Sequence, residues 1–257
     1  MWTEPGVWVT PWGIAFVVAM LVMWFSSRRN ADAVGIDPSH LDLLVPLSLL
    51  LGTSAAFAGY YFAGLQIRLF EIVLGGAIVV FVYSRIAGLS FRRLLDVLAL
   101  PTLAGVMVQR IGCAFAGCCW GDATSHSWQP GIVYARDSFA FLQQLQAGVL
   151  DENASLSLPV HPVQIYESLL LFAALFVLLR ISKAALTPGK LAASTACVYA
   201  AIRFVLEFLR ADSANVLSGL TVVHVQSAVL MALVIVIWTI SQSAMMANGM
   251  PRSGAKT

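Results

Sequence analysis

The chain is built around Gln109-Arg110-Ile111-Gly112-Cys113-Ala114-Phe115-Ala116-Gly117-Cys118-Cys119-Trp120-Gly121, which carries an arginine at the end of an apolar segment into a glycine-rich bend. An unmatched arginine at bilayer depth costs about 2.5–3.5 kcal/mol on insertion scales. Such a residue is retained where it meets an anion, a water-filled cavity or a functional partner. A second arginine of this kind, Arg203, lies in another apolar segment. We therefore expect two membrane arginines that face one anionic group.

The composition indicates an integral membrane protein. Hydrophobic residues make up 59% of the 257 residues and charged residues only 11%, and the mean hydropathy is +0.83. Soluble domains carry about 25% charged residues. Four cysteines do not make a disulfide framework. Nucleic-acid-binding motifs are absent from the sequence, so we expect no nucleic-acid partner.

Seven apolar runs approach the roughly 20 residues needed to cross a hydrocarbon core about 30 Å thick. They lie at roughly 8–26, 41–63, 70–88, 94–115, 165–186, 190–209 and 221–243. The first run is followed by Ser26-Ser27-Arg28-Arg29 rather than a small-residue cleavage site, so we expect it to be retained as a transmembrane helix. Strand-like alternation is absent. We predict an all-α, polytopic membrane helical bundle that forms a single domain over residues 1–257.

The positions of Lys and Arg predict the orientation, because cytoplasmic loops are enriched in both. One set of loops between the predicted spans holds only Arg68, Arg136 and Arg210. The other set holds Arg28, Arg29, Arg85, Arg92, Arg93, Arg180, Lys183, Lys190, Arg252 and Lys256. We therefore predict that the N-terminus lies outside and the C-terminus lies in the cytoplasm.

Residues 117–164 form the one long connection between predicted spans, and the predicted orientation places them outside. Connections longer than about 15 residues are usually functional or disordered. This one has aromatic residues and a mixed pattern, which favours an ordered external cap. We expect a turn at Trp128-Gln129-Pro130-Gly131, a short helix from Phe139 to Leu150, and an extended approach to the fifth span at Pro159-Val160-His161-Pro162.

Polar residues of several spans reach one depth near the outer leaflet. Four of them recur at i, i+4, i+8 and i+11 on one helix face: Tyr199, Arg203, Glu207 and Arg210. The others come from neighbouring spans: Arg110, Glu167, His224 and Gln226. Because the planar fork of arginine suits bidentate contact with phosphate, we favour a site for an anionic lipid headgroup. The alternative is a buried ion-pair network, Arg203–Glu207 or Arg110–Glu167, that only fixes helix packing.

These motifs resemble the prolipoprotein diacylglyceryl transferase family. The family's arginine-glycine motif is matched without gaps by Arg110, Gly112, Gly117, Trp120 and Gly121. The stretch His161-Pro162-Val163-Gln164-Ile165-Tyr166-Glu167 is similar to the family's His-Pro-Ser-Gln-Leu-Tyr-Glu. The stretch Tyr199-Ala200-Ala201-Ile202-Arg203, followed by Glu207-Phe208-Leu209-Arg210, is similar to its other arginine motif. The resemblance covers most of the chain.

The resemblance implies an enzyme of the bacterial cytoplasmic (inner) membrane. In that family the enzyme moves the diacylglyceryl group of phosphatidylglycerol onto a lipobox cysteine thiol of a prolipoprotein and releases glycerol phosphate. By resemblance, Arg110 and Arg203 are catalytic and hold the lipid phosphate. The implied substrate-binding residues are Gly121, Gln164, Tyr166, Glu167, Tyr199, Glu207 and Arg210. We expect no cofactor and no metal.

The chain departs from the family at several positions. Leu74-Gly75-Gly76 stands where the family has His-Gly-Gly, whose histidine is a candidate base for the thiol. Cys113 and Cys118 replace an asparagine and a glutamate, and Trp12 replaces a tyrosine. His161 and His224 are the alternative bases, since imidazole is suited to proton transfer near neutral pH. Both also fit helix-end hydrogen bonding without catalysis, and we place His161 with the catalytic residues.

The thiol group Cys113, Cys118 and Cys119 allows four interpretations. The three side chains could be small packing residues, or form a disulfide in an oxidising external compartment. They could supply a thiolate activated by Arg110, or bind a metal together with His126, although this spacing is not a standard zinc pattern. Two other functions follow for the chain: an inactive phospholipid-binding protein, or a thiol-redox protein that uses Cys118 and Cys119.

Overall fold

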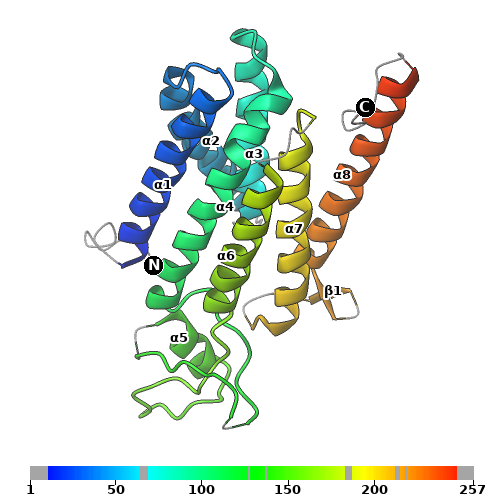
Figure 1. The fold of residues 1–257 in the computed structure, drawn as a ribbon. Helices are drawn as coiled ribbons and strands as arrows, with labels where there is room; N and C mark the ends of the chain where they lie inside the picture. The colour runs from blue at the N-terminus through cyan, green and yellow to red at the C-terminus, as the bar shows by residue number, and fades with distance from the viewer. Residues whose placement is uncertain are drawn as a thin grey trace. The chain divides into compact units, whose positions relative to one another are not determined.

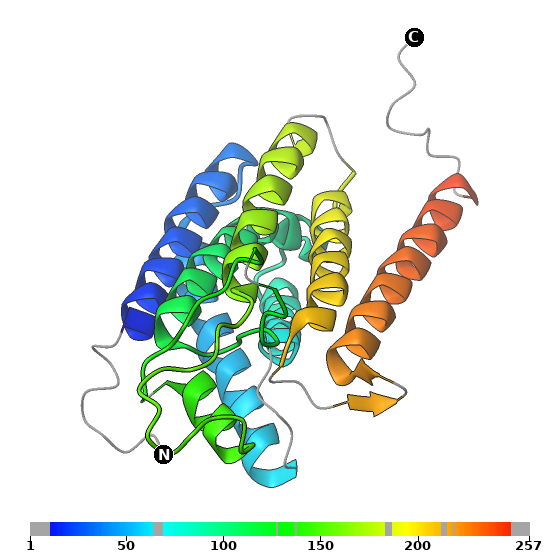
Figure 2. The same cartoon turned by 90° about the horizontal axis from the view of Figure 1, so that it is seen from below.

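Helices dominate the structure, a computed structural model that describes residues 11–63, 69–126, 128–136, 138–182, 187–211, 215–217 and 219–247 (Figure 1). The helices are α1 (Pro11–Ala33), α2 (Ser39–Ala63), α3 (Leu69–Ile86), α4 (Phe91–Ala116), α5 (Phe139–Gln146), α6 (Val163–Ser182), α7 (Lys190–Leu206) and α8 (Val222–Ala247). A 3-10 turn at Glu207–Leu209 extends α7. The strands β1 (Asn215–Leu217) and β2 (Leu220–Thr221) pair antiparallel directly before α8 (Figure 2).

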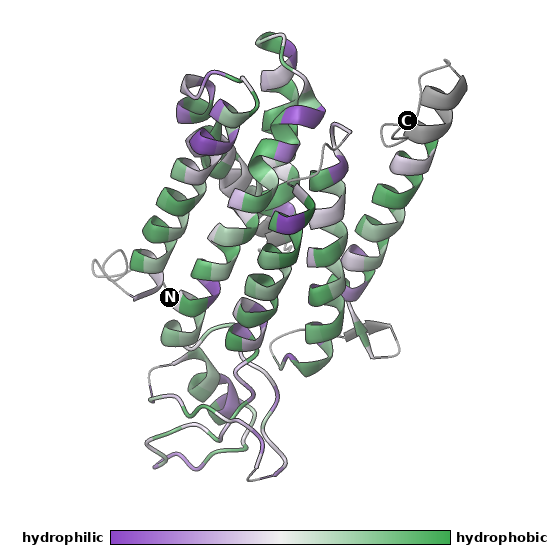
Figure 3. Ribbon diagram, in the orientation of Figure 1, coloured by the Kyte–Doolittle hydropathy of each residue, from purple (hydrophilic) through white to green (hydrophobic). Residues whose placement is uncertain are grey.

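Six of the described helices are long and apolar enough to cross a membrane: α1, α2, α4, α6, α8, and α7 together with its 3-10 turn. Colouring by hydropathy shows apolar residues along most of their length (Figure 3). The 18-residue α3 coincides with the remaining predicted span. The prediction of an all-α polytopic membrane protein is therefore confirmed. The short hairpin β1–β2, with strands of three and two residues, is an addition that the sequence pattern did not indicate.

Helix α1 continues beyond the apolar run that predicted it, as far as Ala33. Ser27 Oγ donates to the Met23 carbonyl at 2.6 Å, which satisfies the hydroxyl inside the helix. Arg28 forms an ion pair with Asp42 of α2. Polar side chains that find partners therefore let the helix pass the point where its hydropathy falls. The start of the first predicted span, 8–10, and the end of the fifth, 183–186, lie outside the described residues.

The chain divides into two compact units. The described residues of Met1–Ala19, Ala104–Leu175 and Cys197–Ala232 form the first unit. Those of Met20–Leu103, Phe176–Ala196 and Leu233–Thr257 form the second. All residues predicted for the phospholipid site belong to the first unit, whereas Leu74-Gly75-Gly76 belongs to the second. The single domain over 1–257 stays a prediction.

In the second unit, α2 and α3 approach closely through two glycines. A Cβ on Gly75 would lie 2.9 Å from the Gly52 Cα, and a Cβ on Gly52 would lie 2.5 Å from the Ile72 carbonyl oxygen. Small residues at such contacts are what let membrane helices approach each other. Helix packing therefore accounts for Gly75, while the neighbouring Leu74 is exposed.

In the first unit, the connection between α4 and α6 is ordered over its described residues. Helix α5 begins after Ser138, whose Oγ accepts the Phe141 N–H at 3.2 Å. The predicted short helix is thus confirmed, although it ends at Gln146 rather than Leu150. Val160 exchanges two backbone hydrogen bonds with Ile132, at 2.9 and 3.0 Å, so the extended approach to α6 is also confirmed. A small core beneath this connection is formed by Trp120, Tyr134, Ala140 and Val160.

Candidate functional site

Five charged side chains of the first unit form a chain of ion pairs. Arg110 Nε, on α4, lies 3.0 Å from Glu167 Oε1, on α6. Arg203, on α7, lies 3.1 Å from the other Glu167 oxygen and 3.0 Å from Glu207 Oε2. Arg210 Nε lies 3.8 Å from the same Glu207 oxygen. Polar residues that the sequence placed at one depth are therefore in direct contact.

The centre of this network is buried. Glu167 is 0% exposed, Glu207 is 2% exposed and Arg203 is 5% exposed. A buried charge must be paired, because removing it from water is costly. Each of the two carboxylates contacts a guanidinium group, so this requirement is met. Arg203 and Glu207, which the sequence pattern placed on one helix face, are thus both buried inside the protein.

The network holds more positive than negative charge. Three guanidinium groups, which stay protonated in proteins, share two carboxylates, so three minus two leaves one positive charge when both glutamates are ionised. Both pairs of the packing interpretation, Arg203–Glu207 and Arg110–Glu167, are present. A network that only held helices together would need no excess charge. This count covers the five side chains of the network alone, and a further carboxylate, that of Asp122, lines the adjoining cavity.

A cavity of about 330 Å³ adjoins the network. It is lined by Asp122, Glu207, Phe208, Arg210, Ala211, Gly219, Thr221 and His224. Ligand pockets typically enclose about 300–1,000 Å³, so the cavity has room for a small polar group. Because Glu207 and Arg210 belong to both the network and the cavity wall, an anion in the cavity meets one end of the network.

His224, in the first turn of α8, adds a buried polar atom to the cavity wall. Its Nδ1 accepts the Thr221 N–H at 3.0 Å, and Thr221 Oγ1 donates to Glu207 Oε1 at 2.9 Å. Because Nδ1 is the acceptor, the neutral ring carries its hydrogen on Nε2. His224 is 1% exposed, and its Nε2 has no hydrogen-bond partner within the part of the chain that the structure describes. The geometry thus leaves this buried N–H without an acceptor among the described residues.

Gly121 is the point where three segments meet. A Cβ on this residue would lie 2.6 Å from Val163 Cγ2, 2.7 Å from the Leu209 carbonyl oxygen and 2.8 Å from His161 Cβ. The Gly121 N–H also donates to the His161 carbonyl at 3.0 Å. Any side chain here would push His161 away from the backbone that leads to Arg210. The structure shows a packing contact for Gly121, and its predicted contact with substrate stays a prediction.

The residues from His161 to Glu167 make contacts with several other parts of the first unit. Tyr166 donates its hydroxyl hydrogen to the Pro130 carbonyl at 3.4 Å and lies 3.3 Å from His161 Nδ1. Since the tyrosine hydrogen is engaged, His161 Nδ1 is the donor in this pair and Nε2 keeps its lone pair. Gln164 Nε2 donates to the Cys118 carbonyl at 2.7 Å and so supports the bend after α4.

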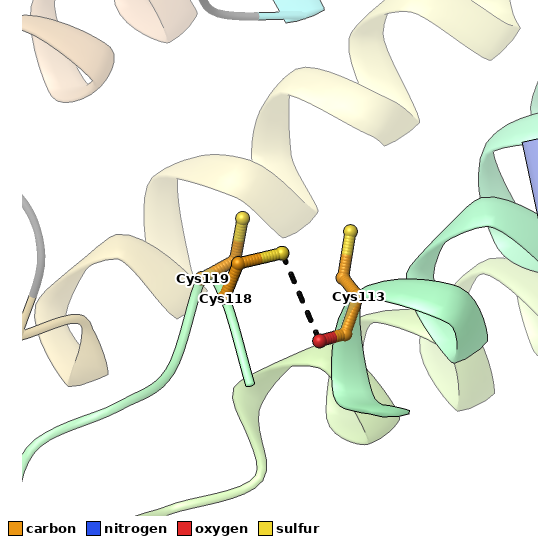
Figure 4. A group of neighbouring side chains, drawn as sticks. All are labelled: Cys113, Cys118 and Cys119. Carbon is orange, nitrogen blue, oxygen red and sulfur yellow. Dashed lines mark hydrogen bonds between the residues drawn. The ribbon is translucent and has the colours of Figure 1, made fainter. Parts of the chain in front are cut away.

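The three cysteines form a compact group of thiols (Figure 4). Cys113 lies at the end of α4 and Cys118 and Cys119 lie on the bend that follows, with all three Sγ atoms within 4.8 Å of one another. All three are free, as is Cys197 on α7, so the disulfide interpretation is not what the structure shows. His126 stacks on Trp128, with ring centroids 5.8 Å apart, and does not belong to the group.

The electrostatics of the bend distinguish its two neighbouring thiols. Side-chain hydrogen bonding with Cys113 and Cys118, together with the positive charges of Arg210 and Arg110, holds the pKa of the Cys119 thiol well below its usual value. The Cys118 thiol also donates to the Cys113 carbonyl at 3.7 Å. Hydrogen bonding to Cys113 and Cys119, followed by burial, raises the pKa of the Cys118 thiol. Cys119 is therefore the sulfur most readily deprotonated in this pair.

Two residues at the site were not predicted from the sequence. Thr221 joins Glu207 to His224, and Asp122 lines the cavity. Neither belongs to a spacing pattern that predicts a site: Thr221 opens the final apolar run, and Asp122 follows the glycine-rich bend. Among the predicted residues, Tyr199 lies beside Arg110. Glu207, Arg210 and His224 are the predicted residues that line the cavity. Arg110 and Arg203 are outside its wall, and so are His161 and Gln164.

Comparison with known proteins gives a consistent family match. The chain matches the family model described as prolipoprotein diacylglyceryl transferase over residues 2–240. It is 30% identical to the phosphatidylglycerol–prolipoprotein diacylglyceryl transferase of Clostridium tetani over 145 residues, which are 56% of this chain and 51% of that protein. For the protein of the same name from Dehalococcoides mccartyi, the values are 28% over 177 residues, 69% of this chain and 62% of the relative. The protein of the same name from Shouchella clausii is 25% identical over 245 residues, which are 88% of this chain and 84% of that relative.

The alignments with the first two relatives thus span between half and two thirds of those proteins, at 51% and 62%. The family model, in contrast, extends from residue 2 to residue 240 of the 257. Its range includes the arginine network, the cavity and the thiol group. This chain therefore belongs to the prolipoprotein diacylglyceryl transferase family.

Proposed function

We propose that this chain is a phospholipid-dependent diacylglyceryl transferase of the bacterial cytoplasmic membrane. It takes phosphatidylglycerol, moves the diacylglyceryl group onto the cysteine thiol of a prolipoprotein, and releases glycerol phosphate. The names of its relatives state both substrates, phosphatidylglycerol and a prolipoprotein. Membership of their family supports the same class of reaction here. The distribution of Lys and Arg supports a site that faces the outer leaflet.

The observation that carries the proposal is a network of three guanidinium groups that reaches the wall of a cavity. The network supplies three guanidinium groups, and a phosphodiester in the cavity would contact Arg210 beside the carboxylates of Glu207 and Asp122. Guanidinium groups bind phosphate oxygens through paired hydrogen bonds. The N–H of His224 Nε2 provides a further donor in the cavity wall.

The reaction places its largest charge change on the phosphate. The acceptor sulfur attacks the diacylglyceryl carbon that is bonded to a phosphate oxygen, so a C–S bond forms while the C–O bond breaks. The departing glycerol phosphate gains negative charge, and the thiol proton passes to a base. Cations already in position stabilise this transition state more than the ground state. We assign this role to Arg110 and Arg203.

The two histidines differ in which ring nitrogen carries the hydrogen, and this difference suggests different roles. His161 keeps a lone pair on Nε2, so it is the proposed proton acceptor, and its Cβ is held against Gly121 near the segment that leads to Arg210. His224 instead presents an N–H, because its Nδ1 accepts from Thr221. We therefore assign His224 to headgroup binding rather than to proton removal.

Replacing His224 by leucine is expected to raise the KM for phosphatidylglycerol several-fold with a smaller change in kcat, because the variant loses an N–H donor but keeps the bulk of the side chain. His224→Gln should recover most of the affinity, since its amide also donates. Steady-state transfer kinetics at varied lipid concentration measure both constants. An equal loss of kcat in both variants would instead identify His224 as the base.

The proposed function is tested with the purified full-length chain, acyl-labelled phosphatidylglycerol and a lipobox peptide. We expect label on the cysteine peptide and none on a matched peptide with serine in its place, since sulfur is the acceptor. Binding of labelled lipid to the protein is measured in parallel. Lipid binding without transfer to the cysteine peptide would contradict the transferase and leave the inactive phospholipid-binding protein.

A further inference from the structure

We propose that Cys113, Cys118 and Cys119 form a binding site for one thiophilic d10 metal ion, Cu(I) or Zn(II), held by three thiolate sulfurs. The site is separate from the phospholipid cavity, whose wall contains none of the three cysteines. It also differs from the metal arrangement considered from the sequence, because His126 takes no part.

The geometry is close to that of a bound state. Metal–thiolate bonds of about 2.3 Å place three sulfurs about 4 Å apart when they surround one ion in a plane. The three Sγ atoms here already lie within 4.8 Å of one another. Closing on an ion would need less than about 1 Å of movement per sulfur pair, which side-chain rotation supplies.

The choice of ion follows from the donors. Three soft sulfurs with no fourth protein ligand in the group favour Cu(I), which is satisfied by three thiolates. Zn(II) also binds thiolates but completes a tetrahedron with a water molecule. Hard cations such as Mg²⁺ and Ca²⁺ prefer oxygen ligands and do not fit this group.

The backbone supports the site at some energetic cost. Cys119 has a φ of 62° and is the non-glycine residue with positive φ in the described part of the chain. A residue with a side chain rarely adopts this conformation, and the strain is of order 1–3 kcal/mol. The bend with this conformation keeps the Cys119 Sγ within 4.8 Å of the other two sulfurs, and the Gln164–Cys118 hydrogen bond of 2.7 Å holds the bend in place.

The surrounding charge suits a thiolate-bound ion. Three thiolates around Cu(I) carry a net charge of minus two, and around Zn(II) minus one. The positive charges of Arg110 and Arg210 act on Cys119 and would offset this charge. Each sulfur that is still protonated releases its proton as the metal–sulfur bond forms, with no change of oxidation state. The bound ion would join the end of α4 to the bend and so fix the segment between Arg110 and Gly121.

The test uses the full-length chain in detergent, reduced and stripped of metal. Cu(I) is offered in competition with a chromophoric Cu(I) chelator, and Zn(II) with a chromophoric Zn(II) chelator. We expect one equivalent of at least one ion to be withheld from its chelator, with a rise in Tm on loading. Cys197→Ser is the matched control, because Cys197 lies outside the group and should leave the stoichiometry at one.

Two variants test the ligands. The triple change Cys113→Ser, Cys118→Ser and Cys119→Ser should withhold no ion. Cys119→Gly should also lose the ion while keeping the fold, because glycine adopts the positive φ without strain. The proposal is overturned if the chain withholds neither ion while all four thiols titrate in denaturant. It is equally overturned if the triple variant, folded by its Tm and elution volume, still binds one equivalent.

Discussion

Replacing Arg203 by alanine is expected to abolish transfer and to lower the free energy of unfolding by about 3–5 kcal/mol, the usual loss when one partner of a buried ion pair is removed. Arg203 is 5% exposed and contacts Glu167 and Glu207 at 3.1 and 3.0 Å. Without Arg203, the buried carboxylates of Glu167 and Glu207 each lose one positively charged partner. Thermal unfolding in detergent and transfer to the lipobox peptide measure the two effects.

A matched control is Arg180→Ala, which removes an exposed arginine of α6 that lies over the Phe176 ring. This variant should keep both stability and transfer. Adding Glu167→Gln and Glu207→Gln to Arg203→Ala neutralises the two carboxylates, so it should recover part of the stability and none of the activity. If Arg203→Ala unfolds at the wild-type temperature and still transfers lipid, neither the ion-pair role nor the catalytic role holds.

Replacing Arg110 by alanine is expected to slow transfer about 100- to 1,000-fold, the range seen when one preorganised donor to a developing anion is removed. The fold should survive, because Glu167 keeps its contact with Arg203 at 3.1 Å. Arg110 is therefore the better probe of chemistry, and Arg203 the better probe of stability. The rate is measured at saturating phosphatidylglycerol, and Tm is recorded for the same preparation.

Arg110→Lys is the conservative comparison for this second prediction. Lysine keeps the positive charge but lacks the planar fork that contacts two oxygens at once. Its transfer rate should lie between those of the wild type and Arg110→Ala. Equal rates for wild type and Arg110→Ala would contradict the catalytic role, and a lower Tm in that case would leave the arginine a packing role alone.

The sequence predicted those contacts of the site that follow from the helix repeat and from the depth of residues in the membrane. Arg203 and Glu207 are four residues apart on one helix, so their contact follows from helix geometry. The contact between Arg110 and Glu167 follows from two spans that run in opposite directions and carry these residues at the same depth. The all-α membrane fold followed from the lengths of the apolar runs.

The parts that the sequence did not predict depend on tertiary contacts. Thr221 acquires its role because the hairpin before α8 brings its hydroxyl to Glu207. The thiol group depends on the left-handed backbone of Cys119, which no spacing of cysteines reveals. The extension of α1 to Ala33 depends on an ion pair between Arg28 and Asp42, which lie on different helices.

The most direct test of the central claim is the ratio of two products in one reaction: lipidated peptide and released glycerol phosphate. A transferase that breaks the bond between diacylglyceryl carbon and phosphate oxygen yields one glycerol phosphate for each lipidated peptide. We predict this ratio for the wild type, with both products falling together in Arg110→Ala. Glycerol phosphate released without lipidated peptide, or lipidation that Arg110→Ala leaves unchanged, would contradict the account.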